Sequence, residues 1–296
     1  MKPTDLFTDL NDFQKYTDGL TADTTYAQLG PSITTVVNAT VLPMVTAQVY
    51  IALADAAAPE EGDTEEEKAA KERALEGKEL LKTAVAAGAM LQYQIFASVK
   101  KNGGEGSLYK YQHEEIKDHY REALWGAMDQ LLELLDANPS IGDFENTDEY
   151  KERQELPVKN AREFDRYYGI GASSFFYHKV LFLLRQVWRS DVKPLLPANP
   201  TEEMAELAKE ALCYKVVALA VMQFDVTELP RAIRWDYNHE YTKGSDPQTR
   251  SSLYAQLIAR FNADASSLEN LKRSAAGASS VVMNNNREEN KYYGVL

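Results

Sequence analysis

Two short segments of the chain each place a histidine beside a glutamate in a similar setting. Residues 109–114 read Tyr-Lys-Tyr-Gln-His-Glu, and residues 235–240, 126 positions further along, read Trp-Asp-Tyr-Asn-His-Glu. Imidazole and carboxylate groups are common ligands of zinc and related metals. Two equivalent segments in a pseudo-twofold arrangement could therefore converge on one metal ion. The candidate ligands are His113, Glu114, His239 and Glu240.

A structural interpretation competes with this metal site. In it, each segment is a corner whose aromatic side chains pack, while the His and Glu side chains bond to nearby backbone. Repeated units preserve packing more often than chemistry, so we favour this interpretation. It assigns a structural role to Tyr109, Tyr111, His113, Trp235, Tyr237 and His239. We therefore expect no catalytic residue, no resident metal and no cofactor, and we do not expect an enzyme.

The two His-Glu segments belong to a longer internal similarity. Each follows an apolar segment with a similar opening, at 79–84 and at 206–211. Further upstream, six positions match at a separation of 151, namely Ile33, Val36, Val37, Val41, Pro43 and Met44 with Leu184, Val187, Trp188, Val192, Pro194 and Leu195. An acidic insert at 56–78 accounts for the longer spacing of this match. Self-similarity at fixed spacing predicts one helical unit that is present twice.

Hydrophobic periodicity predicts a mainly α fold with two tandem pseudo-repeats of a helical bundle. Short strands are allowed in the loops, and the β-branched residues of 31–55 leave a strand open there as well. We expect repeat 1 at 1–138 with the insert at 56–78, and repeat 2 at 172–274. The polar sequence between them, at 139–171, predicts a linker. Residues 275–296 lack periodicity and predict an extended C-terminal arm.

Composition narrows the possible partners. The chain has 296 residues, 44% of them hydrophobic, which is enough for a substantial core. Its net charge of −13 argues against a surface that grips nucleic acid or anionic lipid, because both require clustered Lys and Arg. We expect neither a membrane span nor a signal sequence, and so a chain made in a cytoplasm. The single cysteine, Cys213, lies in an apolar helical segment and predicts a buried thiol.

The order of these segments resembles a known protein family. The chain begins with Leu6-Phe7-Thr8, continues through a helix to Pro43, the segment at 79 and the first aromatic hexad, and restarts at 173–176 before reaching Val192-Lys193-Pro194. This order is similar to that of duplicated, mainly helical proteins of tailed bacteriophages and prophages of gut bacteria, including the crAss-like group. The resemblance spans about residues 6 to 275. It departs from the family pattern at the acidic insert and in the tail.

The resemblance implies a structural virion protein, a head-to-tail connector or neck ring subunit that oligomerises around a portal. The expected partners are further copies of the chain, the portal and other neck or tail proteins, with DNA passing through the lumen without sequence-specific contacts. The virion, assembled in the host cytoplasm, is the expected location. We expect the tail to dock on a neighbouring chain through Tyr292, Tyr293, Val295 and Leu296. Two alternatives remain: a cytoplasmic metal-binding or hydrolytic helical-bundle enzyme that uses the two His-Glu pairs, and an intracellular adaptor.

Overall fold

The computed structural model describes residues 2–20, 24–101, 110–230, 232–233 and 246–275. For 95–101, 110–114, 227, 246–249 and 275 it describes the backbone alone. Helix accounts for 80% of the structure, and none of the described residues lies in a strand. The predicted mainly α fold is therefore confirmed. The strand interpretation of 31–55 is wrong, because these residues form consecutive helices.

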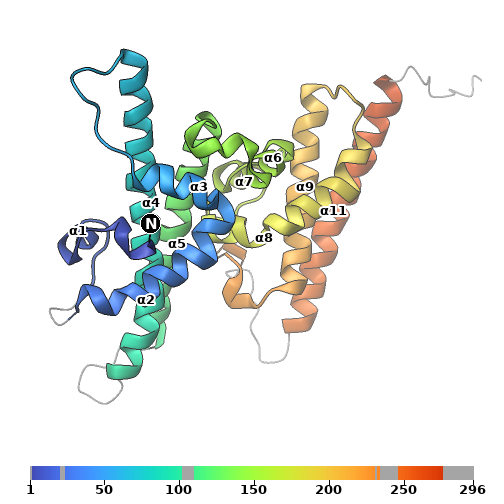
Figure 1. Cartoon of the computed structure of the whole chain (residues 1–296). Coiled ribbons are helices and arrows are strands. Elements are labelled where there is room, and N and C mark those ends of the chain that lie inside the picture. The colour runs from blue at the N-terminus through green and yellow to red at the C-terminus, as the bar shows by residue number, and fades with distance from the viewer. Residues whose placement is uncertain (1, 21–23, 102–109, 231, 234–245, 276–296) are drawn as a thin grey trace, which may run out of the picture. The chain divides into compact units, whose positions relative to one another are not determined.

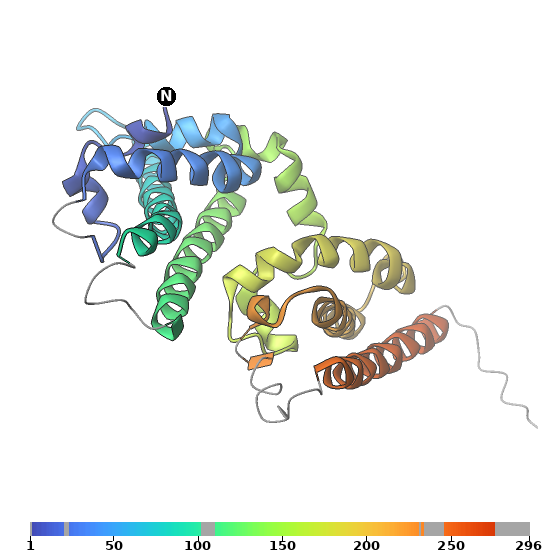
Figure 2. The same ribbon diagram turned by 90° about the horizontal axis from the view of Figure 1, so that it is seen from below.

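The chain divides into two compact units, each shown in Figures 1 and 2. Unit 1 comprises residues 1–165 and 170–179, and unit 2 comprises residues 166–169 and 180–296. The helices of unit 1 up to the middle of the chain are η1 (Pro3–Leu6), α1 (Leu10–Gln14), α2 (Tyr26–Val36), η2 (Val37–Val41), α3 (Leu42–Ala54), α4 (Glu65–Lys101) and α5 (Lys110–Ala137). Then follow η3 (Ile141–Asn146), α6 (Asp148–Glu155), α7 (Ala161–Tyr167) and α8 (Ser174–Val187), of which α7 ends and α8 continues in unit 2.

The core of unit 1 is built on the antiparallel pair α4 and α5, against which α2 packs (Figure 1). Residues 84–90 of α4 are buried on every side. Gly88 permits this close packing, because a Cβ there would lie 2.7 Å from Val36 Cγ1 on α2. Residues 65–78 of the acidic insert form the N-terminal part of the same 37-residue helix, and Thr64 and Glu67 form the capping box that starts it. Most side chains at 60–76 are exposed, as their charge predicts.

Residues 139–171, where we expect a linker, form several helices. This segment contains η3, α6 and α7, and the part up to residue 165 belongs to unit 1. Its apolar side chains are too widely spaced to show a helical period, yet Phe144, Val158 and Phe164 are fully buried. Arg153 is also buried and bonds to Asp136 on α5, with Nη2 2.7 Å from Oδ2. A few large buried side chains therefore hold this segment against unit 1, although the segment is polar on average.

Unit 2 is organised around the antiparallel helices α9 (Glu202–Gln223) and α11 (Asp246–Ala275), which lie side by side in both views (Figures 1 and 2). The end of α8 leads into η4 (Trp188–Val192) and η5 (Lys193–Leu195), and η6 (Val226–Glu228) follows α9. Cys213 is buried on α9, as expected. Lys215 joins the elements, because its Nζ lies 2.7 Å from Asp191 Oδ1 and 4.4 Å from the centre of the Phe261 ring. Burial of α9 against α11 and η4 thus holds unit 2 together.

Both units contain the same local distortion at the aligned positions. η2 and η4 are π-helical turns, and each ends two residues before the proline of the matched set, Pro43 or Pro194. The residue before each proline donates its N–H five residues back, Leu42 to the Val37 carbonyl and Lys193 to the Trp188 carbonyl. Proline has no N–H and its ring clashes with the preceding turn, so a wider turn relieves the helix. The duplication itself stays a prediction, and the C-terminal arm lies outside the described residues.

Candidate functional site

The predicted metal ligands fall largely outside the described residues. His113 and Glu114 lie in the first turns of α5, where the structure describes the backbone alone. His239 and Glu240 lie in 234–245, as do Trp235 and Tyr237, while Tyr109 lies in 102–109, all outside the described part. The tail residues Tyr292, Tyr293, Val295 and Leu296 are outside it too. Among the residues whose side chains are described, no three His, Cys, Asp or Glu side chains gather as they would around a metal.

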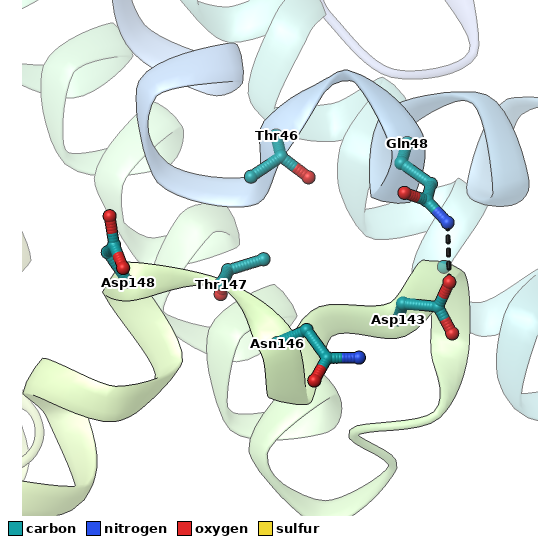
Figure 3. A pocket seen from close by; sticks show the side chains of 7 residues that line it. Thr46, Gln48, Asp143, Asn146, Thr147 and Asp148 are labelled. Carbon is teal, nitrogen blue, oxygen red and sulfur yellow. Dashed lines mark hydrogen bonds between the residues drawn. The ribbon is translucent and has the colours of Figure 1, made fainter.

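A polar pocket lies beside α3, in unit 1. Its volume is about 490 Å³, and Figure 3 shows α3 on one side and the segment from η3 to α6 on the other. The lining residues are Thr46, Gln48, Gly142, Asp143, Asn146, Thr147 and Asp148. Gln48 Nε2 donates to Asp143 Oδ2 across one end of the pocket, at 2.5 Å. The pocket therefore presents hydroxyl, amide and carboxylate oxygens from two elements almost a hundred residues apart.

Backbone geometry fixes both walls of this pocket. Thr46 has φ 65° and ψ 161°, which interrupts α3 and is costly for a β-branched residue. On the other wall, Gly142 and Asp143 both have φ 57°. Gly142 also touches α3, because a Cβ there would lie 2.6 Å from Val49 Cα. Thr147 then begins α6 by accepting the Tyr150 N–H at 3.1 Å.

The chemistry available in the pocket is that of hydrogen-bond acceptors. Asp143 and Asp148 form no ion pair with any residue that the structure describes. The lining includes no histidine, cysteine, lysine or tyrosine; its hydroxyl groups belong to Thr46 and Thr147, and its carboxylates belong to Asp143 and Asp148. The pocket is suited to receive amide or cationic donors. The pocket could not be predicted from the sequence, because nothing in the sequence marks the unusual backbone of Thr46. The stretch from Pro139 to Gly142 is typical of turns, but a turn alone does not indicate a pocket.

A second, smaller cleft of about 330 Å³ lies between the N-terminal segment and helices α4 and α5. Tyr120 closes one side by donating its hydroxyl to the Asp18 carbonyl at 2.7 Å. Burial raises the pKa of this phenol, which therefore stays protonated and acts as a hydrogen-bond donor. His119 lines the cleft but has an exposed side chain. The contacts of this cleft attach the N-terminal segment to the core.

His178 is the most enclosed histidine of the described residues. Its side chain is 2% exposed, its Nε2 lies 2.5 Å from Asp129 Oδ1, and its ring stacks on Trp125 with centroids 4.6 Å apart. Asp129 and the ring resemble the orienting half of a catalytic triad. Neither His178 nor Asp129 lines the polar pocket or the smaller cleft. The arrangement ties α8 to α5 within unit 1.

A surface without charged side chains runs along α2, η2 and α3. The 29 residues from Tyr26 to Ala54 include no Asp, Glu, Lys, Arg or His. One stripe of this run is buried in the core, through residues such as Ile33, Val41, Val45, Val49 and Leu53. The opposite stripe is exposed, and we call it the neutral face: Ala27, Gln28, Pro31 and Thr35 on α2, followed by Asn38, Ala39, Pro43, Ala47, Gln48 and Ile51 on η2 and α3.

The same run is long and apolar enough to cross a membrane by length and composition. Its structure differs from a spanning helix, which needs about 20 continuous apolar residues. The π turn, Pro43 and the backbone of Thr46 interrupt it, and its largest apolar side chains pack inside unit 1. This run is therefore a core element of unit 1 that leaves one side exposed.

Comparison with known proteins identifies no relative of the chain. No protein-family model matches the chain, and neither a curated protein nor a solved structure is significantly similar to it.

Proposed function

We propose that the chain is a structural subunit of a protein assembly, specifically a head-to-tail connector or neck ring protein of a tailed bacteriophage virion. The neutral face is the observation on which this proposal depends. Charged residues make up 26% of the chain, yet none occurs in the 29 residues of this run. Depletion of charge is the compositional mark of the centre of a protein interface, whereas an isolated soluble surface favours Lys and Glu.

The rest of the molecule supports a structural role. The polar pocket beside α3 presents acceptor oxygens, and the contacts of the smaller cleft attach the N-terminal segment to the core. The ion pair of Arg153 with Asp136 joins α6 to α5 within unit 1. The phage assignment itself comes from the resemblance in segment order, which spans about residues 6 to 275. The portal and neighbouring neck or tail proteins are the partners that this assignment predicts.

Light scattering on the full-length protein tests the proposal, with and without the portal protein of the same phage. The monomer mass is 33.3 kDa, and we expect a much larger complex when the portal is present. A chain truncated after Ser274 should bind more weakly, because it lacks the predicted docking arm. A matched chain of full length, with Tyr292, Tyr293, Val295 and Leu296 replaced by serine, separates the effect of these side chains from that of chain length. The proposal would be contradicted if the protein stayed a monomer in the presence of the portal and if truncation of the tail changed nothing.

A further inference from the structure

The neutral face on α2, η2 and α3 has no cover among the described residues, and its chemistry limits what could cover it. Its exposed side chains are small or amide-bearing, and Ile51, 43% exposed, is its one large apolar side chain. A face that binds nucleic acid needs Lys and Arg to neutralise phosphates. A face that lies in a lipid surface needs a row of large apolar side chains flanked by Lys and Arg. The neutral face offers neither, so its partner is a protein.

Small side chains on this face allow a partner backbone to approach closely. Ala27, Thr35 and Ala39 recur at helical spacing on α2 and η2, and Ala47 follows the break that Thr46 makes in α3. Helices that meet through such residues pack at short interaxial distance and gain dispersion contacts along the crossing. Gln48 at one end of the stripe also lines the polar pocket, which supplies hydrogen-bond acceptors at the edge of the face. A centre depleted of charge with a polar rim is the usual anatomy of an interface.

The charge of the chain favours a second copy as the partner. Each copy has a net charge of −13, and most of the acidic insert on α4 is exposed. Two copies that met through such surfaces would repel each other, and like charges across an interface cost several kcal/mol. The neutral face is a surface of ten exposed, uncharged residues where two copies can touch without that repulsion. We infer that the neutral face is the contact surface between copies of this chain. This inference rests on the proposed function and adds which surface joins the subunits.

Charge insertion into the neutral face tests the inference. Ala39→Glu places a carboxylate at the centre of the face, at an exposed position where the monomer has room for it. Ala70→Glu adds the same charge to the exposed part of α4 and is the matched control. Sedimentation velocity over a range of concentrations measures the dissociation constant of the full-length protein and of both variants. We expect self-association of the wild type, at least a tenfold weaker constant for Ala39→Glu, and less than a twofold change for Ala70→Glu.

Cross-linking gives a second readout, which reports which residues lie close together in the complex. Cys213 is the only natural cysteine and is buried, so Ala39→Cys introduces a single accessible thiol. A short bis-maleimide should join two copies of Ala39→Cys across a symmetric contact and should leave Ala70→Cys monomeric. In a head-to-tail contact Ala39 meets a different surface, and a heterobifunctional reagent with mass spectrometry would identify it. Circular dichroism and thermal melting confirm that each variant is folded.

The outcomes separate this inference from the proposed function. Equal weakening by both glutamate variants, or no effect of Ala39→Glu, would show that copies meet elsewhere, and the connector proposal would stand. A wild type that remains monomeric yet binds the portal would likewise overturn the self-contact alone. A monomer that binds neither copies nor portal would overturn both. Selective loss of self-association in Ala39→Glu would establish the neutral face as the subunit contact.

Discussion

Lys82 Nζ lies 2.9 Å from Asp12 Oδ2, a contact between residues 70 positions apart that is almost closed to solvent. The two side chains are 10% and 9% exposed. Lys82 also lies over two aromatic rings, 5.7 Å from the centre of Phe7 and 5.2 Å from that of Tyr16. Asp12 in turn accepts the Thr8 N–H. This cluster attaches the N-terminal segment, which is short and has little core of its own, to helix α4.

Removal of one partner of this pair should destabilise the protein strongly. Lys82→Met leaves the Asp12 carboxylate buried without its main cation, and we expect a loss of roughly 3 kcal/mol in the free energy of unfolding. The matched control is Lys15→Met, since Lys15 contacts the same carboxylate at 3.5 Å but is 69% exposed, where ion pairs contribute little. Urea denaturation followed by circular dichroism measures the free energy of unfolding of both variants. Equal, small losses in the two variants would show that the buried pair does not anchor the segment.

The same pair should make stability depend on pH in the acidic range. Burial acts to raise the pKa of Asp12, but the hydrogen bonds from Lys82 and from the Thr8 N–H outweigh it and hold the pKa below its usual value of 3.8. A carboxyl group with a lowered folded pKa stabilises the protein fully above its unfolded pKa, and this contribution is lost as pH falls through the folded value. Asp12→Asn should therefore remove part of the loss of stability seen below about pH 4. Unfolding curves at pH 7, 4 and 3 would test it, and parallel losses in variant and wild type would contradict it.

Gly142 and Gly126 should respond in opposite directions to the same substitution. Gly142 has φ 57°, and a Cβ there would meet Val49 Cα at 2.6 Å, so Gly142→Ala strains the backbone and pushes η3 away from α3. We expect a loss of about 2 kcal/mol or more. Gly126 lies within α5, where a Cβ would meet no neighbouring side chain or element within 4 Å, so Gly126→Ala should stabilise by about 0.5–1 kcal/mol. Thermal melts of both variants measure the contrast, and a harmless Gly142→Ala would show that the pocket wall is not rigid.

The helical fold could be predicted because its signals are local. Thr201 caps α9 by accepting the Met204 N–H, and Thr64 caps α4 by accepting the Glu67 N–H; threonine is a preferred residue at this position. Proline disturbs the helix at both Pro43 and Pro194, and each follows a π turn after one intervening residue. Such features depend on a residue and its neighbours within one turn, which the sequence contains in full.

The pocket and the packed segment after α5 could not be predicted in this way. Thr46 adopts a positive φ although threonine disfavours it, so the conformation is imposed by tertiary packing around α3. Similarly, Arg153 has the sequence context of an ordinary surface residue on a charged helix, yet it is buried because Asp136 on another helix pairs with it. Both depend on contacts between distant residues. The absence of charge in the neutral face is visible in the sequence. Its exposure to solvent could not be predicted, because it depends on the packing of α2, η2 and α3.

Asp264 on α11 should be a source of instability at neutral pH. The residue is 4% exposed, its Oδ2 has no hydrogen-bond partner among the described residues, and Arg260 Nε lies 3.5 Å from Oδ1. Burial raises the pKa of Asp264 above its usual value of 3.8, and Glu210 adds to this while Arg260 opposes it. A carboxyl group with a raised folded pKa favours the folded state at low pH, and the benefit is lost as pH rises through the folded value.

Asp264→Asn should therefore stabilise the protein at pH 7, by roughly 1 kcal/mol, because it removes a poorly compensated buried charge. The gain should shrink as pH falls through the raised folded pKa of Asp264, where the wild-type carboxyl group becomes neutral. Glu269→Gln, at an exposed position of the same helix, is the control and should change little. Differential scanning calorimetry at pH 7 and pH 4 measures the stability of both variants. A loss of stability in Asp264→Asn at pH 7 would show that Arg260 compensates the charge of Asp264.

The metal-binding alternative makes a prediction that purified protein can decide. If His113, Glu114, His239 and Glu240 are structural corners, as we favour, the full-length protein should hold no stoichiometric zinc or other divalent metal. The variant His113→Ala/His239→Ala should then keep the same metal content, whereas His119→Ala, an exposed histidine on α5, serves as the control. Inductively coupled plasma mass spectrometry after dialysis measures the metal. One equivalent in wild type and in His119→Ala, but none in the double variant, would show that the repeated pairs converge on an ion. Metal binding would then be part of the fold of the repeat, because ligands from two distant segments could meet only in the folded chain.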